Sequence, residues 1–431
     1  MTFNPLKEKG IPIDKQLRNW HDIAKRKFNK NEVNCYSRTR QILMNGIEIE
    51  AWNFKHCFSR CCQDEETKKF LAMTKKTEDQ QQSTINWMSP ADQSVLETTL
   101  GYEQVAVDLT AWLAQNEPDD YVRETFDFGL LEDFDHLYRY SQWAYMMHGI
   151  NPDDIVQHQT DIMISRPTQQ HHNCNVLRLR KPYDKNTASP QTKVNILTLV
   201  SGEQQTHNYY AEHGMNYGNH TLRETYAEIK DVEEEHVNMY ESLIDPTESF
   251  YEKLLLHEFT EVCNYYNCYQ DELNDMIKPV WELFLEQELG HLHEAVELFK
   301  THEKRDPEEV IGNEIILPCH FESQKEYVKN ILENEIDKRI GIDKDYLKID
   351  ELPNDWASYE VQKTLNADGS PTERTIKLIK EAKNRDIILA DEKLMKDIPK
   401  LMKRGLEQKA LACDSVTQEE YKEMTSKEFE F

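Results

Sequence analysis

The fold is decided by two stretches, LRETYAEIKDVEEEHVNMYESL at residues 222–243 and IKPVWELFLEQELGHLHEAVEL at residues 277–298. In both, one stripe of side chains steps alternately by four and three residues, which places it on a single helix face. The stripes are Leu222, Tyr226, Ile229, Glu233, His236, Tyr240, Leu243 and Ile277, Trp281, Phe284, Glu288, His291, Ala295, Leu298. Each Glu-x-x-His pair therefore occupies positions that a bundle helix normally fills with apolar side chains.

A further glutamate precedes each Glu-x-x-His pair by thirty residues. Glu203 stands before Glu233 and Glu258 before Glu288, so the whole unit repeats after 55 residues. Thirty residues span half a helix, a turn and half of the next helix, which lets the two carboxylates meet across a helical hairpin. Turn residues lie at 214–219, 245–247 and 267–274. The sequence therefore predicts a four-helix bundle over residues 191–305.

Burying these carboxylates requires a compensating positive charge. A buried carboxylate without a partner is destabilising, and several in one core section also repel one another. Two divalent cations would neutralise them. The predicted metal ligands are Glu203, Glu233, His236, Glu258, Glu288 and His291. The alternative is a buried network in which Glu and His pair only with each other, which is stable only when every member has a partner.

The N-terminal half repeats the pattern imperfectly. Glu103, Asp133 and His136 stand 100 residues before the first unit, and Glu48, Glu78 and Gln81 stand 55 residues earlier still. We predict a second, degenerate bundle over residues 30–150. Asp is one methylene shorter than Glu, and Gln offers only a weak neutral oxygen. Residues 30–150 could hold one metal, a weaker pair or none, in which case this half is a packing partner.

The pattern resembles the ferritin-like di-iron carboxylate superfamily, in which one Glu comes from each of two helices and Glu-x-x-His from each of the other two. The resemblance implies that Glu203 and Glu258 are terminal ligands, that Glu233 and Glu288 are bridging ligands, and that His236 and His291 supply one nitrogen per iron. The chain lacks the two Cys-x-x-Cys pairs of a rubredoxin module. Two bundles and a long tail also differ from the single-bundle chains that form storage shells.

The resemblance implies two iron ions and an oxidoreductase that reacts with dioxygen or peroxide, either removing the oxidant or oxidising a small substrate. The ligand types leave manganese open, and the substrate and electron donor are unspecified. The alternative from another class is a metal-binding or scaffold protein without turnover.

Composition excludes some partners. A formal net charge of -28 argues against nucleic acid and against anionic lipid. No apolar run is long enough to span a bilayer, and residues 1–16 show no secretory pattern. The nine cysteines form no disulfide framework. We therefore expect a cytoplasmic protein.

Two regions flank the predicted bundles. Residues 151–190 form a linker whose His171, His172 and Cys174 we interpret as part of a surface loop rather than a metal site. Residues 306–431 form a helical tail, with amphipathic helices at 322–339 and 373–409, that caps the bundles or mediates homodimer formation. The sequence as a whole predicts an all-α protein with two tandem ferritin-like bundles, of which the second carries the complete site.

Overall fold

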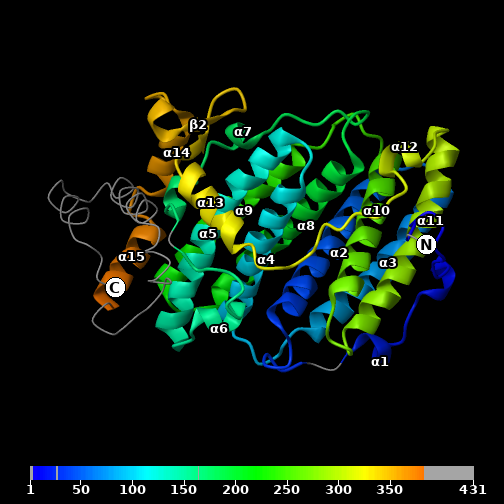
Figure 1. The fold of residues 1–431 in the computed structure, drawn as a ribbon, viewed down its shortest axis with the longest axis horizontal. Helices are drawn as coiled ribbons and strands as arrows, with labels where there is room; N and C mark the ends of the chain where they lie inside the picture. The colour runs from blue at the N-terminus through cyan, green and yellow to red at the C-terminus, as the bar shows by residue number, and fades with distance from the viewer. Residues whose placement is uncertain (1–2, 26–27, 164, 383–431) are drawn as a thin grey trace.

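The computed structural model describes residues 3–25, 28–163 and 165–382, and most of this chain is helical (Figure 1). Helix accounts for 68% and strand for 2%, which confirms the predicted all-α fold. No helix in the described ranges is both long enough and apolar enough to cross a membrane.

The framework consists of four helical hairpins, and the two helices of each hairpin pack together. The hairpins are α2 (Cys35–Cys61) with α3 (Glu65–Met88), α4 (Val95–Asn116) with α5 (Asp120–His148), α8 (Pro190–His213) with α9 (His220–Glu241), and α10 (Phe250–Asp271) with α11 (Lys278–Glu303). Local sequence fixes where they begin. Ser94 and Ser249 start α4 and α10 with capping boxes, and Asn219 caps α9. The turns predicted at 214–219 and 245–247 lie between helices, whereas α10 continues to Asp271, so the turn predicted at 267–274 is shorter than expected.

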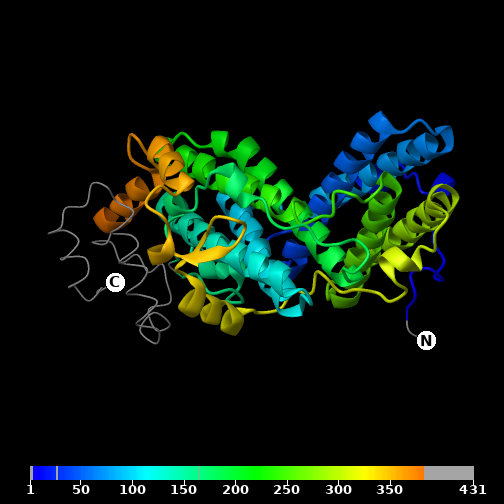
Figure 2. The same cartoon turned by 90° about the horizontal axis from the view of Figure 1, so that it is seen from above.

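The hairpins do not group in chain order. The α4/α5 hairpin packs against α8/α9, whereas α2/α3 packs against α10/α11. We call these the middle bundle (α4, α5, α8, α9) and the flanking bundle (α2, α3, α10, α11). Figures 1 and 2 show the two bundles in opposite halves of the molecule, with α13 (Lys325–Glu335), α14 (Ala357–Leu365) and α15 (Pro371–Ala382) beside the middle bundle. The predicted division into bundles at 30–150 and 191–305 is therefore wrong, although the helices themselves are present.

The two bundles meet where α2 crosses α8. A Cβ atom on Gly46 of α2 would lie 2.6 Å from the backbone oxygen of Ser201 in α8, so the crossing requires glycine at this position. Periodicity reveals which face of a helix is buried, but it does not say which hairpin covers that face. Every hairpin carries two carboxylates thirty residues apart, so spacing alone could not distinguish between the possible partners.

Shorter elements complete the chain. They are α1 (Trp20–Ile23), α6 (Pro152–Val156), α7 (Asn175–Arg178), α12 (Glu308–Ile311), α13 (Lys325–Glu335), β1 (Lys338–Ile340), β2 (Tyr346–Lys348), α14 (Ala357–Leu365) and α15 (Pro371–Ala382). In the tail, α12 packs against α10 of the flanking bundle, whereas α13 packs against α5 and α15 against α9 of the middle bundle.

The tail differs from the prediction in two respects, because α14 was not predicted and the helix predicted at 322–339 is shorter than expected. The helix predicted at 322–339 ends at Glu335, and an antiparallel β1–β2 hairpin follows. Asp343 and Lys344 adopt positive φ in its turn, a conformation that the sequence did not signal because neither residue is glycine. The helix predicted at 373–409 is described as far as Ala382, and its remainder lies outside the described residues.

Candidate metal centre

Six buried side chains converge at the centre of the middle bundle. Helix α4 supplies Glu103, α5 supplies Asp133 and His136, α8 supplies Glu203, and α9 supplies Glu233 and His236. Each is at most 2% exposed. One Glu therefore comes from each of two helices, and a carboxylate-x-x-His pair from each of the other two. This is the complete inventory of a di-metal carboxylate bundle.

The six residues fall into two groups that share Glu233. Asp133, Glu203, Glu233 and His236 offer ligand atoms within 4.8 Å of one another, and Glu103, His136 and Glu233 do the same. The Nδ1 atom of His236 lies 3.5 Å from Asp133 Oδ1, 3.5 Å from Glu203 Oε2 and 3.4 Å from Glu233 Oε2. In the second group, His136 Nδ1 lies 2.9 Å from Glu233 Oε1. The geometry suits two neighbouring cations with one shared carboxylate.

Several polar atoms at this centre have no hydrogen-bond partner within the described structure. They include both oxygens of Asp133, one oxygen each of Glu103, Glu203 and Glu233, and His236 Nδ1. Buried polar groups in proteins are almost always satisfied, and unpaired carboxylate oxygens are especially unfavourable. A cation would satisfy acceptor atoms that face one another without donors. The residues at this centre therefore fit a metal site.

The charges show the same need for cations. Burial, followed by repulsion from neighbouring carboxylates, raises the pKa of Glu103 and Asp133 well above their ordinary values. Burial raises the pKa of Glu203 to about 8, against the attraction of His236. Burial also opposes ionisation of Glu233, but His136 and His236 outweigh it and lower the pKa of this shared carboxyl. Without cations, the four carboxylates resist being ionised together.

Glu132 orients His236 from outside the ligand set. Its Oε2 lies 2.7 Å from His236 Nε2, which leaves Nδ1 facing the other carboxylates. Arg178 donates to both oxygens of Glu132, at 2.8 and 3.0 Å, and His171 Nδ1 lies 2.8 Å from Oε1. A carboxylate that holds the remote nitrogen of a ligating imidazole fixes its tautomer and ring position.

The orienting residues were not identified from the sequence. His171 and His172 are only 1% and 2% exposed, so the predicted surface loop around them is wrong. Arg178 is fully buried. Glu132 could have indicated the orienting residues from the sequence. It is a second acidic residue directly before Asp133, and a buried glutamate needs a cationic partner. Arg166, Arg178 and Arg180 in the linker are the available cations, but their distance along the chain hides the pairing.

Two tyrosines also contact or approach the centre. Tyr210 donates a short hydrogen bond to Glu103 Oε1, which leaves Oε2 of this carboxylate for a metal. The hydroxyl of Tyr240 is buried beside α5, and a Cβ atom on Gly129 would lie 1.9 Å from it. Gly129 is therefore the residue that makes room for Tyr240.

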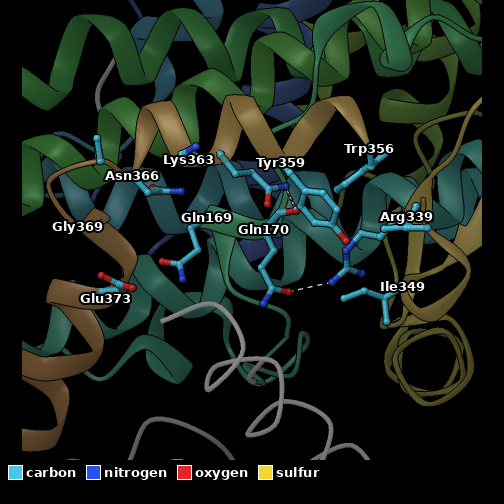
Figure 3. A pocket seen from close by; sticks show the side chains of 13 residues that line it. Gln169, Gln170, Arg339, Ile349, Trp356, Tyr359, Lys363, Asn366, Gly369 and Glu373 are labelled. Carbon is cyan, nitrogen blue, oxygen red and sulfur yellow. Dashed lines mark hydrogen bonds between the residues drawn. The ribbon is translucent and has the colours of Figure 1, made fainter. Parts of the chain in front are cut away.

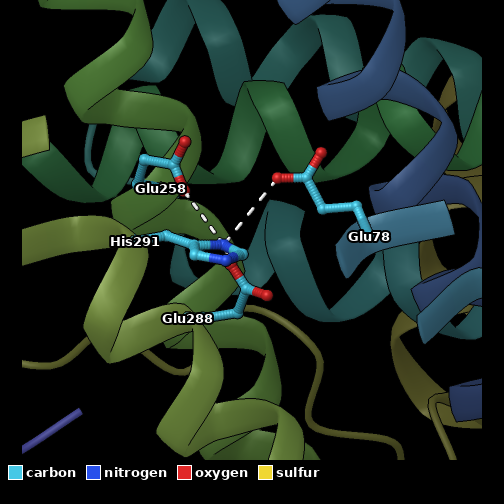
Figure 4. Close-up of side chains that lie close together, drawn as sticks. All are labelled: Glu78, Glu258, Glu288 and His291. Carbon is cyan, nitrogen blue, oxygen red and sulfur yellow. Dashed lines mark hydrogen bonds and ion pairs between the residues drawn. The ribbon is translucent and has the colours of Figure 1, made fainter. Parts of the chain in front are cut away.

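The flanking bundle has a related but altered centre. Glu48 comes from α2, Glu78 and Gln81 from α3, Glu258 from α10, and Glu288 and His291 from α11. Glu78, Glu258, Glu288 and His291 offer ligand atoms within 4.8 Å of one another (Figure 4). The six ligands predicted for residues 191–305 are thus divided between the bundles, and so are the six of the degenerate set, because the hairpins exchange partners.

A lysine lies inside this second centre. Lys55 is fully buried, and its ammonium contacts Glu78, Glu258 and Glu261, at 2.9 Å from Glu258 Oε1 and 3.7 Å from Glu261 Oε2. Burial opposes its charge, but these carboxylates outweigh burial and raise the pKa of Lys55 well above its ordinary value. Lys55 was not predicted, although it stands seven positions after Glu48 and therefore about two turns along the same face of the helix.

A pocket lies outside the layer that orients His236 (Figure 3). Its volume is about 670 Å³, and its lining includes Gln169, Gln170, Arg339, Trp356 and Tyr359. Arg339 donates to Gln170 Oε1 at 2.9 Å, and Gln170 directly precedes His171, which contacts Glu132. The pocket is therefore connected to the orienting residues rather than to the ligands themselves.

Comparisons with protein-family models, curated proteins and solved structures find no match for this chain. The case for a metal centre therefore depends on residue spacing and on the geometry of the two clusters.

Proposed function

We propose that the middle bundle binds two metal ions, with iron favoured and manganese as the alternative, and that the protein is an oxidoreductase reacting with dioxygen or peroxide. The observation that carries the proposal is the sharing of Glu233 between two buried ligand groups, in which several acceptor atoms lack donors within the described structure. Four carboxylates match the charge of two divalent cations, and each group includes one histidine. Oxygen and imidazole ligands of this kind suit Fe and Mn.

The residues around the proposed metal ions have different roles. Glu233 links the two ligand groups, and Glu103 and Glu203 each belong to one group only. Glu132 holds the His236 ring in place, and Tyr210 binds one oxygen of Glu103. Full burial of all six ligands excludes bulk water from the centre. Two redox-active ions at such a centre supply the electrons for a two-electron reduction of dioxygen or peroxide.

The ligand geometry supports binding of two metal ions more directly than it supports oxidant reduction. A turnover measurement therefore distinguishes the oxidoreductase from a metal-binding or scaffold protein without activity. The protein is loaded anaerobically with ferrous iron, desalted, analysed for iron, and then exposed to oxygen or peroxide. We expect bound iron to consume the oxidant and to develop a ferric absorption band. Iron that stays bound but consumes no oxidant would instead support a non-catalytic metal-binding protein.

The matched variants are Glu233→Gln and Glu234→Gln. Glu234 is the next residue on α9, and its side chain is 49% exposed. Glu233→Gln removes the shared carboxylate, so we expect it to lose both the iron of the middle bundle and the oxidant consumption. Glu234→Gln should retain both. Iron content and turnover that survive Glu233→Gln would contradict the proposal.

A further inference from the structure

The two centres are related by a shift of 55 residues along the chain, and two of the substitutions between them decide the chemistry. Gln81 stands where the middle bundle has His136, and Lys55 stands where it has Thr110. The group that corresponds to Asp133, Glu203, Glu233 and His236 keeps metal-binding side chains throughout, as Glu78, Glu258, Glu288 and His291. One of the two ligand groups is therefore intact in the flanking bundle.

His291 has the hydrogen-bonding pattern of a metal ligand. Its Nε2 lies 2.6 Å from Gln16 Oε1. The orientation of the Gln16 amide is fixed, because its Nε2 donates to the backbone oxygens of Ile11 and Gln287, both at 2.8 Å. Since an amide oxygen only accepts, Nε2 of His291 carries the hydrogen, so a cation bound at this histidine would replace any proton at Nδ1 and meet the lone pair of that atom. This Nδ1 lies 2.8 Å from Glu288 Oε2 and 3.8 Å from Glu258 Oε2.

Lys55 uses only one oxygen of each neighbouring ligand. Its ammonium contacts Glu78 Oε1 and Glu258 Oε1. The Oε2 atoms of both carboxylates are buried and have no hydrogen-bond partner in the described structure. Figure 4 shows the carboxylates of Glu78 and Glu258 directed towards His291 from opposite sides. A cation beside Nδ1 would therefore meet the free Oε2 of Glu258, which lies 3.8 Å from Nδ1, and Oε1 of Glu78, also 3.8 Å away, which it would share with the Lys55 ammonium.

Gln81 closes the second ligand group. Its Nε2 donates to Glu288 Oε1 at 2.6 Å, whereas the corresponding His136 brings a ring nitrogen to Glu233. An amide NH₂ is a donor and cannot bind a cation. Where the proposed second ion of the middle bundle would meet a histidine, the flanking bundle thus directs an amide donor to Glu288, and only the neutral Oε1 of Gln81 is left without a partner in the described structure.

We propose that the flanking bundle binds one divalent cation on Glu78, Glu258, Glu288 and His291, and that the Lys55 ammonium supplies the remaining positive charge. The three ligand carboxylates then balance one divalent ion and one ammonium. The chain carries one dinuclear centre and one mononuclear centre built from the same hairpin repeat.

The test uses Mn²⁺ alone, in the full chain carrying Glu233→Gln so that the dinuclear centre is removed. Elemental analysis after desalting should give one Mn²⁺ per chain, with an EPR spectrum of an uncoupled ion. Adding His291→Gln should abolish this binding. No bound Mn²⁺ in Glu233→Gln, or binding unaffected by His291→Gln, would overturn the proposal. Neither result would bear on the proposed dinuclear centre, because metal binding there is measured separately in the chain with intact Glu233.

A second variant tests the role of the ammonium. Lys55→Met removes a positive charge beside the ligands, so Mn²⁺ in the Glu233→Gln chain should bind roughly tenfold tighter or more. The metal-free protein should melt at a lower temperature, because its buried carboxylates lose their counter-ion. The control is Lys76→Met on the surface of α3, where the side chain is 53% exposed, and it should change neither quantity. Unchanged or weaker Mn²⁺ binding in Lys55→Met would contradict the assigned role.

Discussion

The middle and flanking bundles share one hairpin pattern and differ in a few side chains at their centres. Two histidines and four carboxylates face one another in the middle bundle, whereas the flanking bundle replaces one histidine with Gln81 and adds Lys55. The repeated carboxylate and histidine positions of the hairpins therefore determine where a centre lies. Individual substitutions at these positions determine how many cations the centre can bind. A buried lysine beside carboxylates can replace part of the charge of a metal ion.

The bundles also orient their histidines by different means. His236 is held by Glu132 on α5, whereas the corresponding residue of α3 is Thr77, and His291 is held by Gln16 from the N-terminal segment. That segment reaches His291 only because α11 has a glycine, since a Cβ atom on Gly290 would lie 2.1 Å from the oxygen of Ile11. The ionised orienting group occurs in the bundle with two ligand groups, and the neutral amide occurs in the bundle with one.

The largest expected effect is on the histidines of the middle bundle. His136→Ala and His236→Ala each remove the one nitrogen of a ligand group, so each should lower bound metal in the middle bundle by a similar amount, at least tenfold in affinity. Spacing alone assigned His136 to a degenerate site, where its loss would be expected to have a smaller effect. Metal titration of the two variants checks this. A strong loss of metal affinity in only one variant would contradict a shared centre between α4/α5 and α8/α9.

An intermediate effect is expected from Glu132→Gln, which keeps the shape of the side chain but removes the charge that orients His236. Metal affinity should fall roughly 10–100-fold. Thr77→Ala at the corresponding position of the flanking bundle should leave metal affinity unchanged. A purely structural role for Glu132 would lower the melting temperature without changing the affinity of the folded protein for Mn²⁺, so titration of the folded fraction separates the two cases.

A smaller effect should follow from the packing of Tyr240 on Gly129, a pair replaced in the flanking bundle by Ala295 and Thr74. Gly129→Ala places a methyl group against the tyrosine hydroxyl and should destabilise the protein by about 1–3 kcal/mol. Adding Tyr240→Phe removes the hydroxyl and should recover much of the loss. Chemical denaturation of the metal-free variants measures both, and a double variant as unstable as Gly129→Ala alone would show that the clash is not the cause.

Sequence periodicity was sufficient for the helices but not for their partners. The a/d stripes of residues 222–243 and 277–298 predicted long buried helices that are present as α9 and α11. Partner choice depends on contacts such as the close crossing of Gly46 with α8, which no single-helix pattern encodes. Glu132, Arg178 and Lys55 escaped prediction for a similar reason, because each is explained only by residues distant in the chain.

The proposed dinuclear centre requires two cations, one on each side of Glu233. Anomalous diffraction from crystals of the iron- or manganese-loaded protein measures this directly. We predict two adjacent anomalous peaks between α5 and α9, one beside Glu103 and His136 and the other beside Glu203 and His236. Absence of peaks at Glu233, or a single peak held by one ligand group only, would contradict the dinuclear centre.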